Sequence, residues 1–401
     1  MKFYSVLLLV ILILLGGCNR QEELNELLIL TGIGVDLGEN DTVKITFQAV
    51  NPQAQAGGES GGGGSAGQAQ SYTFESEGKD MIEAVFNARS LLSRKLFFSH
   101  ISSLLVSEEF ARKRGIQEIS DFVERHYEIR DNYLLFITKD TTATTILNTF
   151  TPLDNSSTKN IESLTKVRGG KLGIKNGTKL EDFIRWRYGD DRDPVVMGVE
   201  KVDKQAISNN TESLNEIEGN KGALRLTGFA LFDKNSLVDW LSYKDSISWV
   251  IITKESDNVM SYTVKCPDDQ GTIGFLLKEM EVKAEPKIVN EKLNYSVQLD
   301  GRINLQGLSC NIKLSTDQGV EELQTIVNEH IENDLQTALT NAKASQLDYY
   351  GIKNQLSRNQ PDEWKEMKDD WSSLYENMSI DTDVNIYLES PGSRVDNNEG
   401  E

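Results

Sequence analysis

Short apolar runs of strand length alternate with runs of helical periodicity in the first half of the sequence, and this order restricts the fold more than any other feature. Residues 27–35 and 43–49 predict a β-hairpin with one buried face, because apolar and polar side chains alternate along the second run. Residues 81–92 then repeat apolar side chains at helical spacing, and further strands and helices follow. Strands separated by helices are typical of a mixed sheet, so we expect an N-terminal α/β domain over residues 18–200.

The second half of the sequence is expected to form two smaller domains. A β-rich middle domain over residues 201–283 contains four predicted strands, at residues 226–232, 249–253, 261–266 and 275–282. A C-terminal α+β domain over residues 284–401 begins with paired strands around an expected turn at Asp300-Gly301. A long amphipathic helix follows, with apolar side chains at three- and four-residue steps: Val320, Leu323, Val327, Ile331, Leu335, Ala338 and Ala342. The expected fold class is a mixed α+β and α/β protein of three domains, each with a β-sheet and packed helices.

The composition excludes several classes of protein. With 62 Asp and Glu against 42 Lys and Arg, the chain of 401 residues has a formal net charge of −20. This charge repels polyanions, so we expect no nucleic-acid partner. Hydrophobic residues make up 38% of the chain, which suits a folded globular protein rather than one with many membrane spans. Residues 57–67 hold seven Gly in eleven positions and predict a flexible Gly-rich loop within the N-terminal domain.

The N-terminus has the pattern of a lipoprotein signal peptide over residues 1–17. One lysine precedes an almost unbroken apolar run over residues 3–15. About 20 apolar residues are needed to cross a bilayer, so this run predicts the core of a signal peptide rather than a membrane span. The sequence Leu15-Gly16-Gly17-Cys18 resembles a bacterial lipobox. We therefore expect diacylglycerol on the Cys18 sulfur and cleavage between Gly17 and Cys18.

Lipidation at Cys18 predicts a membrane-anchored protein. Two acyl chains, such as palmitate, hold a protein stably at a bilayer where a single chain does not. An ordinary secretory signal with a chance cysteine is the alternative. On an anionic membrane, the net negative charge is expected to hold the folded body away from the lipid surface.

Two further cysteines, Cys266 and Cys310, remain after Cys18. Both lie in strand-like sequence. In an oxidising exterior they can form a disulfide, whereas two buried thiols are the alternative.

The usual catalytic patterns are absent from the sequence or lie in the wrong context. Residues 58–62 and 63–67 match G-x-S-x-G, but both fall in the Gly-rich loop, without the strand that a nucleophile elbow requires. His100, His126 and His330 are isolated from one another and from cysteine, which argues against a zinc site. We expect no catalytic, cofactor-binding or metal-binding residues. A hydrolase is still possible, because two carboxylates that converge in a cleft can act as general acid and base. The sequence contains four pairs of neighbouring acidic residues: Glu108-Glu109, Asp190-Asp191, Asp268-Asp269 and Asp369-Asp370.

The order of several short motifs resembles the Ger(x)C family, the lipoprotein C subunits of spore germinant receptors. The similarity covers nearly the whole chain after Cys18. It rests on the following segments: Glu23 to Leu27, Gly32-Ile33-Gly34-Val35-Asp36, Gln48-Ala49-Val50-Asn51-Pro52, Glu128-Ile129-Arg130, Leu226-Thr227-Gly228-Phe229-Ala230-Leu231-Phe232, and the paired Trp364 and Trp371. Two features differ from the family: Asn19-Arg20 stands where members often have Trp-Asp, and the loop at 57–67 is long.

The resemblance implies a non-enzymatic three-domain protein, anchored through Cys18 to the outer surface of the inner spore membrane. It implies two integral-membrane partners, the receptor subunits A and B, and a role in nutrient-triggered germination. A substrate-binding lipoprotein of an importer and a cell-wall hydrolase lipoprotein are the alternatives. An importer protein is expected to show two similar α/β lobes, and a hydrolase a converged acid pair or zinc set.

Overall fold

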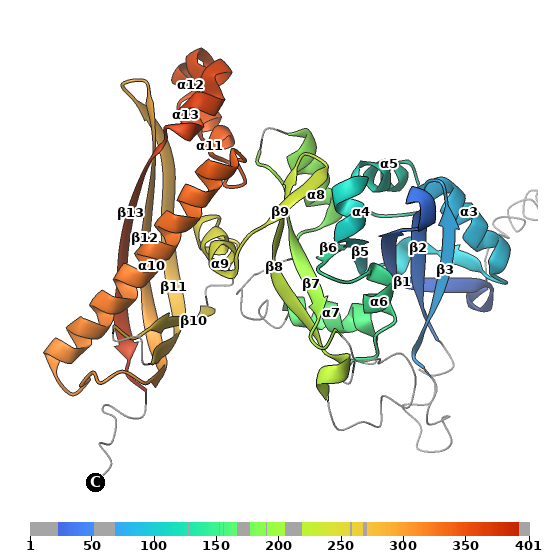
Figure 1. Cartoon of the computed structure of the whole chain (residues 1–401), viewed down its shortest axis with the longest axis horizontal. Coiled ribbons are helices and arrows are strands. Elements are labelled where there is room, and N and C mark those ends of the chain that lie inside the picture. Colours follow the sequence, from blue (N-terminus) through green and yellow to red (C-terminus); the bar gives the residue numbers. More distant parts are fainter. Residues whose placement is uncertain are drawn as a thin grey trace, which may run out of the picture.

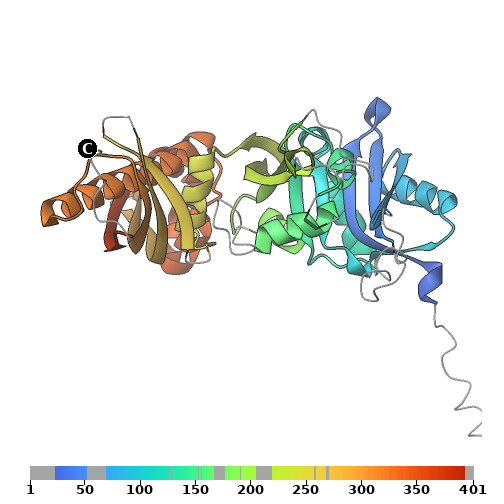
Figure 2. The same ribbon diagram turned by 90° about the horizontal axis from the view of Figure 1, so that it is seen from below.

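The computed structural model describes residues 23–51, 69–126, 128–151, 153–154, 156–166, 177–189, 191–204, 219–256, 259–267 and 271–392. Two β-sheets lie one after the other along the long axis of the molecule (Figures 1 and 2). We call residues 23–240, which form the sheet nearer the N-terminus, the first lobe, and residues 259–392 the second lobe. The expected signal peptide, the Gly17 and Cys18 site, and the Gly-rich loop lie outside the described residues.

The first lobe is built on a mixed sheet with the order β3-β2-β1-β5-β6-β7-β8-β9, in which β4 also pairs with β1. Strand β1 is antiparallel to β2 and parallel to β5, and β5, β6 and β7 run parallel to one another. This arrangement confirms the expected mixed sheet. The strands are β1 (Leu27–Leu37), β2 (Val43–Val50), β3 (Ser71–Gly78), β4 (Lys95–Phe97), β5 (Ser103–Ser107), β6 (Leu134–Thr138), β7 (Val195–Lys201), β8 (Leu224–Asp233) and β9 (Ser236–Trp240).

Helices cover both faces of this sheet because the central strands are apolar on both sides. Leu104 and Val106 belong to one buried cluster with α3, α4 and α5, whereas Leu105 between them belongs to a second cluster with α6 and α7. Alternate residues of a strand point to opposite faces, so each cluster marks one face. The helices are α3 (Met81–Leu91), α4 (Glu108–Lys113), α5 (Gln117–Arg125), α6 (Ala143–Leu147), α7 (Ser157–Lys166) and α8 (Leu180–Tyr188), with short 3₁₀ turns η1 (Leu24–Glu26), η2 (Glu39–Asp41), η3 (Phe98–His100) and η6 (Gly219–Gly222).

The Gly-Ile-Gly-Val-Asp motif on β1 holds α6 and α7 against the sheet. A side chain at Gly32 would clash with Thr158 on α7, so the motif requires glycine for this close approach. The buried Asp36 carboxylate accepts hydrogen bonds from the backbone N–H groups of Ala143 (2.7 Å) and Thr144 (2.8 Å) at the start of α6. A carboxylate stabilises a helix N-terminus by satisfying such otherwise unpaired N–H groups.

Gln48 on β2 performs a similar role between α6 and α7. Its side-chain amide donates to the Leu147 carbonyl oxygen (2.8 Å) and to Ser157 Oγ (2.9 Å), and its side-chain oxygen accepts from Thr158 Oγ1 (2.7 Å). Gln48 is buried, so these bonds offset the cost of removing its amide from water. Two of the motifs that indicated the family therefore hold these helices in place.

The second lobe is a four-stranded sheet with one long helix across it (Figure 1). The order is β10-β11-β12-β13, and β13 runs parallel to β12. The sheet packs against the long helix α10 (Asp317–Ser345). Its strands are β10 (Val259–Lys265), β11 (Thr272–Val289), β12 (Lys292–Leu308) and β13 (Ser379–Ser390). Between α10 and β13 the chain forms α11 (Ile352–Asn359), α12 (Pro361–Met367), η7 (Lys368–Asp370) and α13 (Trp371–Glu376). The expected long helix is confirmed, and six of its seven predicted apolar residues are buried: Leu323, Val327, Ile331, Leu335, Ala338 and Ala342.

Cys266 and Cys310 form a disulfide in the structure. The sequence had left open a disulfide or two buried thiols, and the structure has the disulfide. Cys266 directly follows β10, and Cys310 lies two residues after β12. Both are buried, and the bond links two strands that flank β11.

Two predicted elements of the second half of the chain are wrong. Residues 249–253 were expected to be a strand, but they end α9 (Tyr243–Ile252), which Ser242 caps by accepting from the Asp245 N–H (3.1 Å). Every residue from Asp245 to Ile252 is buried, and a helix apolar on all sides lacks the periodicity that distinguishes it from a buried strand.

The predicted turn at Asp300-Gly301 is also wrong, because both residues lie within β12. The hairpin turns instead at Asn290 and Glu291, whose φ values of 51° and 61° are those of a tight two-residue turn.

The residues expected to form a middle domain, 201–283, are divided between the two sheets. Strands β8 and β9 extend the first sheet, and β10 and β11 belong to the second. The proposed boundaries of three domains at 18–200, 201–283 and 284–401 stay a prediction.

Candidate functional site at the junction of the lobes

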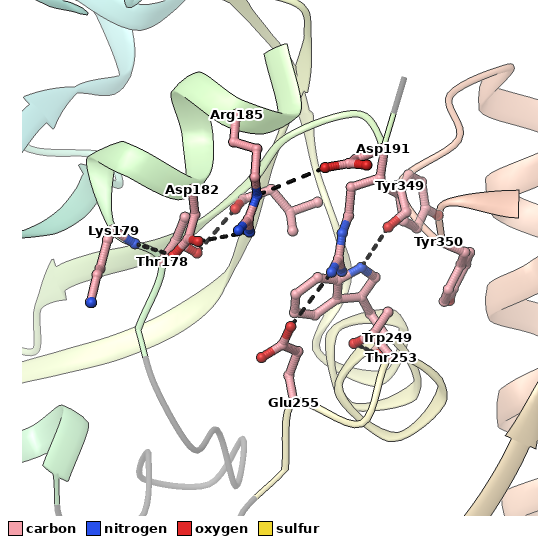
Figure 3. Close-up of polar contacts among 12 residues, drawn as sticks. Thr178, Lys179, Asp182, Arg185, Asp191, Trp249, Thr253, Glu255, Tyr349 and Tyr350 are labelled. Carbon is pink, nitrogen blue, oxygen red and sulfur yellow. Dashed lines mark hydrogen bonds and ion pairs between the residues drawn. The ribbon is translucent and has the colours of Figure 1, made fainter. Parts of the chain in front are cut away.

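A hollow of about 540 Å³ lies where the two lobes meet. The end of α8 and the segment that follows it form one side, the end of α9 forms the floor, and α11 of the second lobe closes the other side. Figure 3 shows the Arg185 guanidinium between the carboxylates of Asp182 and Asp191, with a contact to each. At this junction, charged side chains from distant segments converge around a hollow of ligand size.

Arg192 is the central residue of the junction. Its guanidinium lies 4.7 Å from the ring centre of Trp186 and 5.7 Å from that of Trp249. A guanidinium over an indole ring is attracted by the electrons of the ring, and two such rings fix its position. Its nearest carboxylate, Glu255, is 3.6 Å away. Burial lowers the pKa of Arg192, and the nearby Glu255 opposes this effect.

Direct hydrogen bonds also join the lobes. The indole N–H of Trp249 donates to the Tyr349 carbonyl oxygen (2.9 Å; Figure 3). The Asp348 N–H donates to Asp193 Oδ2 (2.6 Å), and the Asp193 N–H donates to the Asp348 carbonyl oxygen (3.0 Å). The two bonds between Asp193 and Asp348, one to a carboxylate and one between backbone groups, fix the segment after α8 to the segment before α11.

Asp348 is a buried carboxyl at this contact. Its side chain accepts hydrogen bonds from the N–H groups of Ile352 and Lys353, both at 2.8 Å, at the start of α11. Burial raises its pKa to about 6, although these two bonds oppose the shift. Burial also raises the pKa of the neighbouring Asp193. The contact between the lobes therefore contains two carboxyl groups that are easier to protonate than free aspartic acid.

The rim of the hollow is formed by cations around one acid. The Asp191 carboxylate accepts from the Asn354 amide (2.8 Å) and lies 3.8 Å from Arg185 and 4.0 Å from Arg358. Lys254 also lines the hollow. Among these residues, the hydrogen bond and ion pairs join amide and guanidinium groups to the Asp191 carboxylate.

The histidines do not converge. His126 lies 5.2 Å from the ring centre of Phe98, and burial lowers its pKa. His330 Nδ1 lies 3.0 Å from the Ile326 carbonyl oxygen, and His100 lies in η3 of the first lobe. Within the described ranges, no group of three His, Cys, Asp or Glu residues is arranged to hold a metal ion. Both G-x-S-x-G matches, Gly17 and Cys18 lie outside those ranges.

Sequence reasoning named Asp191, as part of an acid pair, but missed the other charged and aromatic residues of the junction. Arg192, Trp186, Trp249 and Arg358 were not singled out, because they come from four separate elements and form no local motif. The dense run of cations and aromatics from Arg185 to Tyr188 was the available signal, but such a run is equally typical of an exposed helix.

A second notable surface lies on α3. Ile82, Phe86 and Leu91 are 55%, 61% and 72% exposed on this one helix. Next to it, a hollow of about 550 Å³ is lined by Asn25 and Leu28 from the start of the described chain. Ile82 and Phe86 are four residues apart and therefore lie side by side on the helix, and we call these two residues the α3 surface. Helix α3 and the beginning of β1 lie at the end of the molecule away from the second lobe (Figures 1 and 2).

Comparison with known proteins shows the family. The family model described as the spore germination protein N-terminal domain matches residues 20–201. The model described as spore germination B3/GerAC like, C-terminal, matches residues 227–392. The chain therefore belongs to the Ger(x)C family of spore germination proteins, and its role lies in spore germination.

Individual relatives agree with this assignment. Spore germination protein KC of Bacillus subtilis (strain 168) is 25% identical over 97% of this chain and 96% of its own length. Spore germination protein B3 of the same organism is 20% identical over 94% of each chain. The crystal structure of the GerBC protein matches with a TM-score of 0.54 at 15% identity, covering 89% of this chain and 97% of that chain. This last match shows the fold, and it agrees with the expected α+β class.

Proposed function

We propose that this chain is the lipid-anchored C subunit of a spore germinant receptor, which acts with the membrane subunits A and B in nutrient-triggered germination. The observation that carries this proposal is the match of both family models in the expected order along the chain. None of the described helices is long and apolar enough to cross a membrane. A covalent anchor would therefore supply the attachment that the described helices do not.

The proposed anchor is diacylglycerol on Cys18 at the outer surface of the inner spore membrane. Four residues lie between Cys18 and Glu23, where the described chain begins, so five Cα–Cα steps join the two. An extended chain spans at most about 3.4 Å per residue, so this tether reaches about 17 Å. The start of the first lobe is thereby held near the bilayer, which raises its effective concentration towards partners in the membrane.

The α3 surface is the proposed contact with those partners. Its two apolar side chains, Ile82 and Phe86, are exposed, and α3 lies at the end of the molecule where the described chain begins. Exposed apolar side chains that gather on one helix are typical of a protein interface. The short tether favours partners embedded in the same membrane, namely subunits A and B.

The proposed activity is binding without catalysis. In the junction hollow, the contacts among the lining residues join cations to one acid rather than a nucleophile to a base, and the two lobes differ in the number and order of their strands. The first observation gives no support to a hydrolase, and the second gives none to an importer protein with two similar lobes.

The test is substitution Cys18→Ala in the native gene, with Asn19→Ala as the matched control. The Cys18→Ala protein is expected to leave the membrane fraction, and the spores are expected to germinate slowly with the nutrients of this receptor. Asn19→Ala is expected to preserve both properties. Normal germination with a demonstrably soluble Cys18→Ala protein would contradict the proposal.

A further inference from the structure

The hollow between the lobes has an excess of positive charge in a strongly acidic chain. Its described lining contains four cations, Arg185, Arg192, Lys254 and Arg358, but one acid, Asp191. Two further acids outside the lining, Asp182 and Glu255, pair with Arg185 and Arg192, which leaves four cations against three acids among these described residues. The chain as a whole carries a net charge of −20. A local reversal of sign inside a cleft attracts anions, because low-dielectric walls concentrate the electric field there.

Arg192 is held in place but is not satisfied. A guanidinium has five N–H donors, and only 20% of this side chain is exposed to water. Its Nη1 atom is buried without a hydrogen-bond partner in the part of the chain that the structure describes. Glu255 lies 3.6 Å from Nη2, which is longer than a charged hydrogen bond. A buried cation with unfilled donors is costly, and an anion placed beside it would remove that cost.

Other polar groups of the second lobe border the same hollow. Tyr350 lines the hollow, but its hydroxyl is buried behind the surface and has no hydrogen-bond partner among the described residues. The side chains of Asn354, Gln355 and Arg358 line the hollow from α11. The volume of about 540 Å³ falls in the range of small-molecule sites. A ligand here would contact both lobes.

We propose that this hollow binds a small molecule carrying a carboxylate or phosphate group, with Arg192 and Arg358 as its principal partners. Arginine is suited to this role because its planar fork donates two parallel hydrogen bonds to such an anion. Trp186 and Trp249 position Arg192 through their ring faces. The site is additional to the proposed receptor role and does not depend on the lipid anchor.

The test measures binding to the purified full-length protein in detergent at low ionic strength. Isothermal titration uses two anionic probes, inorganic phosphate and succinate, and the neutral succinamide as a matched control. We expect saturable binding of at least one anion and none of succinamide. Binding of phosphate alone assigns the phosphate class, and binding of succinate alone assigns the carboxylate class.

Three variants locate the site. Arg192→Met keeps an unbranched side chain between the indole rings but removes the charge. Arg358→Gln changes a side chain that is 73% exposed, so this variant is expected to fold like wild type. Each is expected to weaken anion binding at least tenfold. Lys365→Gln removes an exposed cation on α12, outside the hollow, and is expected to have no effect. Failure of both anions to bind, or equal weakening by Arg358→Gln and Lys365→Gln, overturns the proposal. Because no germination is measured, neither outcome bears on the receptor role.

Discussion

Removal of the Cys266–Cys310 disulfide is expected to destabilise the second lobe strongly. The two cysteines are 44 residues apart in sequence, and the bond closes β11 and β12 into one loop. In the chain-entropy model, such a cross-link restricts the unfolded chain, and a loop of this length corresponds to about 4 kcal/mol. That value is a large part of the stability of an ordinary domain.

The perturbation is the double substitution Cys266→Ala and Cys310→Ala, which avoids free thiols. The assay is denaturant unfolding of wild type and variant, followed by hydrogen exchange of the strands in each lobe, because two lobes need not unfold in one step. Exchange in β10–β12 is expected to accelerate, and the slope of the transition is expected to rise because the unfolded chain becomes more expanded.

Two results would refute this reasoning. One is a loss below about 1 kcal/mol in the second lobe, since the loop model requires several times as much. The other is labelling of both cysteines by a thiol reagent in unfolded wild-type protein without reductant, which would show that the bond is absent.

Three other perturbations test separate parts of the structure. Burial raises the pKa of Asp348 from an ordinary 3.8 to about 6. The protonated carboxyl therefore stabilises the folded state fully below about pH 4, and this contribution is lost as the pH rises through 6. In urea unfolding, the free energy of unfolding of wild type should fall by up to about 3 kcal/mol more than that of Asp348→Asn between about pH 4 and 7.5. Asp36→Ala leaves the Ala143 and Thr144 N–H groups unpaired and should cost about 2 kcal/mol in the same assay. Substitution of Ile82 and Phe86 by Ser should leave the unfolding midpoint unchanged but reduce recovery of membrane partners.

Each of these perturbations has its own control. Equal pH dependence of wild type and Asp348→Asn would show that this carboxyl titrates normally. Asp36→Asn retains one acceptor oxygen and should fall between wild type and Asp36→Ala; no difference among the three would remove the capping role. Val238→Ser changes an exposed apolar residue on β9, away from the α3 surface, and should recover partners normally. The same loss with this variant would show that the α3 surface is not special.

The sequence predicted those elements in which periodicity, burial and turn chemistry agree. The long helix α10 was found because its apolar residues occur on one face, and β2 because its apolar and polar residues alternate. Helix α9 was missed because it is buried on all sides, so its apolar run has no period. The turn at Asp300-Gly301 was misplaced because Asp-Gly is a typical turn dipeptide, whereas here neighbouring strands on both sides pair with it.

The junction required three-dimensional information. Trp186, Arg192, Trp249 and Arg358 are separated by up to 172 residues (358 − 186), and no spacing rule relates them. The resemblance to the family came from short motifs, and the structure explains two of them through the buried Asp36 and the buried Gln48, which hold helices to the sheet. Such motifs identify a fold and a family but do not identify a ligand.

Purification of the chain from spore membranes is the most direct test of the receptor assignment. A C-terminal affinity tag on the native protein, gentle solubilisation of inner spore membranes and mass spectrometry would identify what remains bound. The account predicts recovery of two polytopic membrane proteins, subunits A and B, with the chain itself carrying diacylglycerol on Cys18. Recovery of the intact, enriched chain without either polytopic subunit would contradict it.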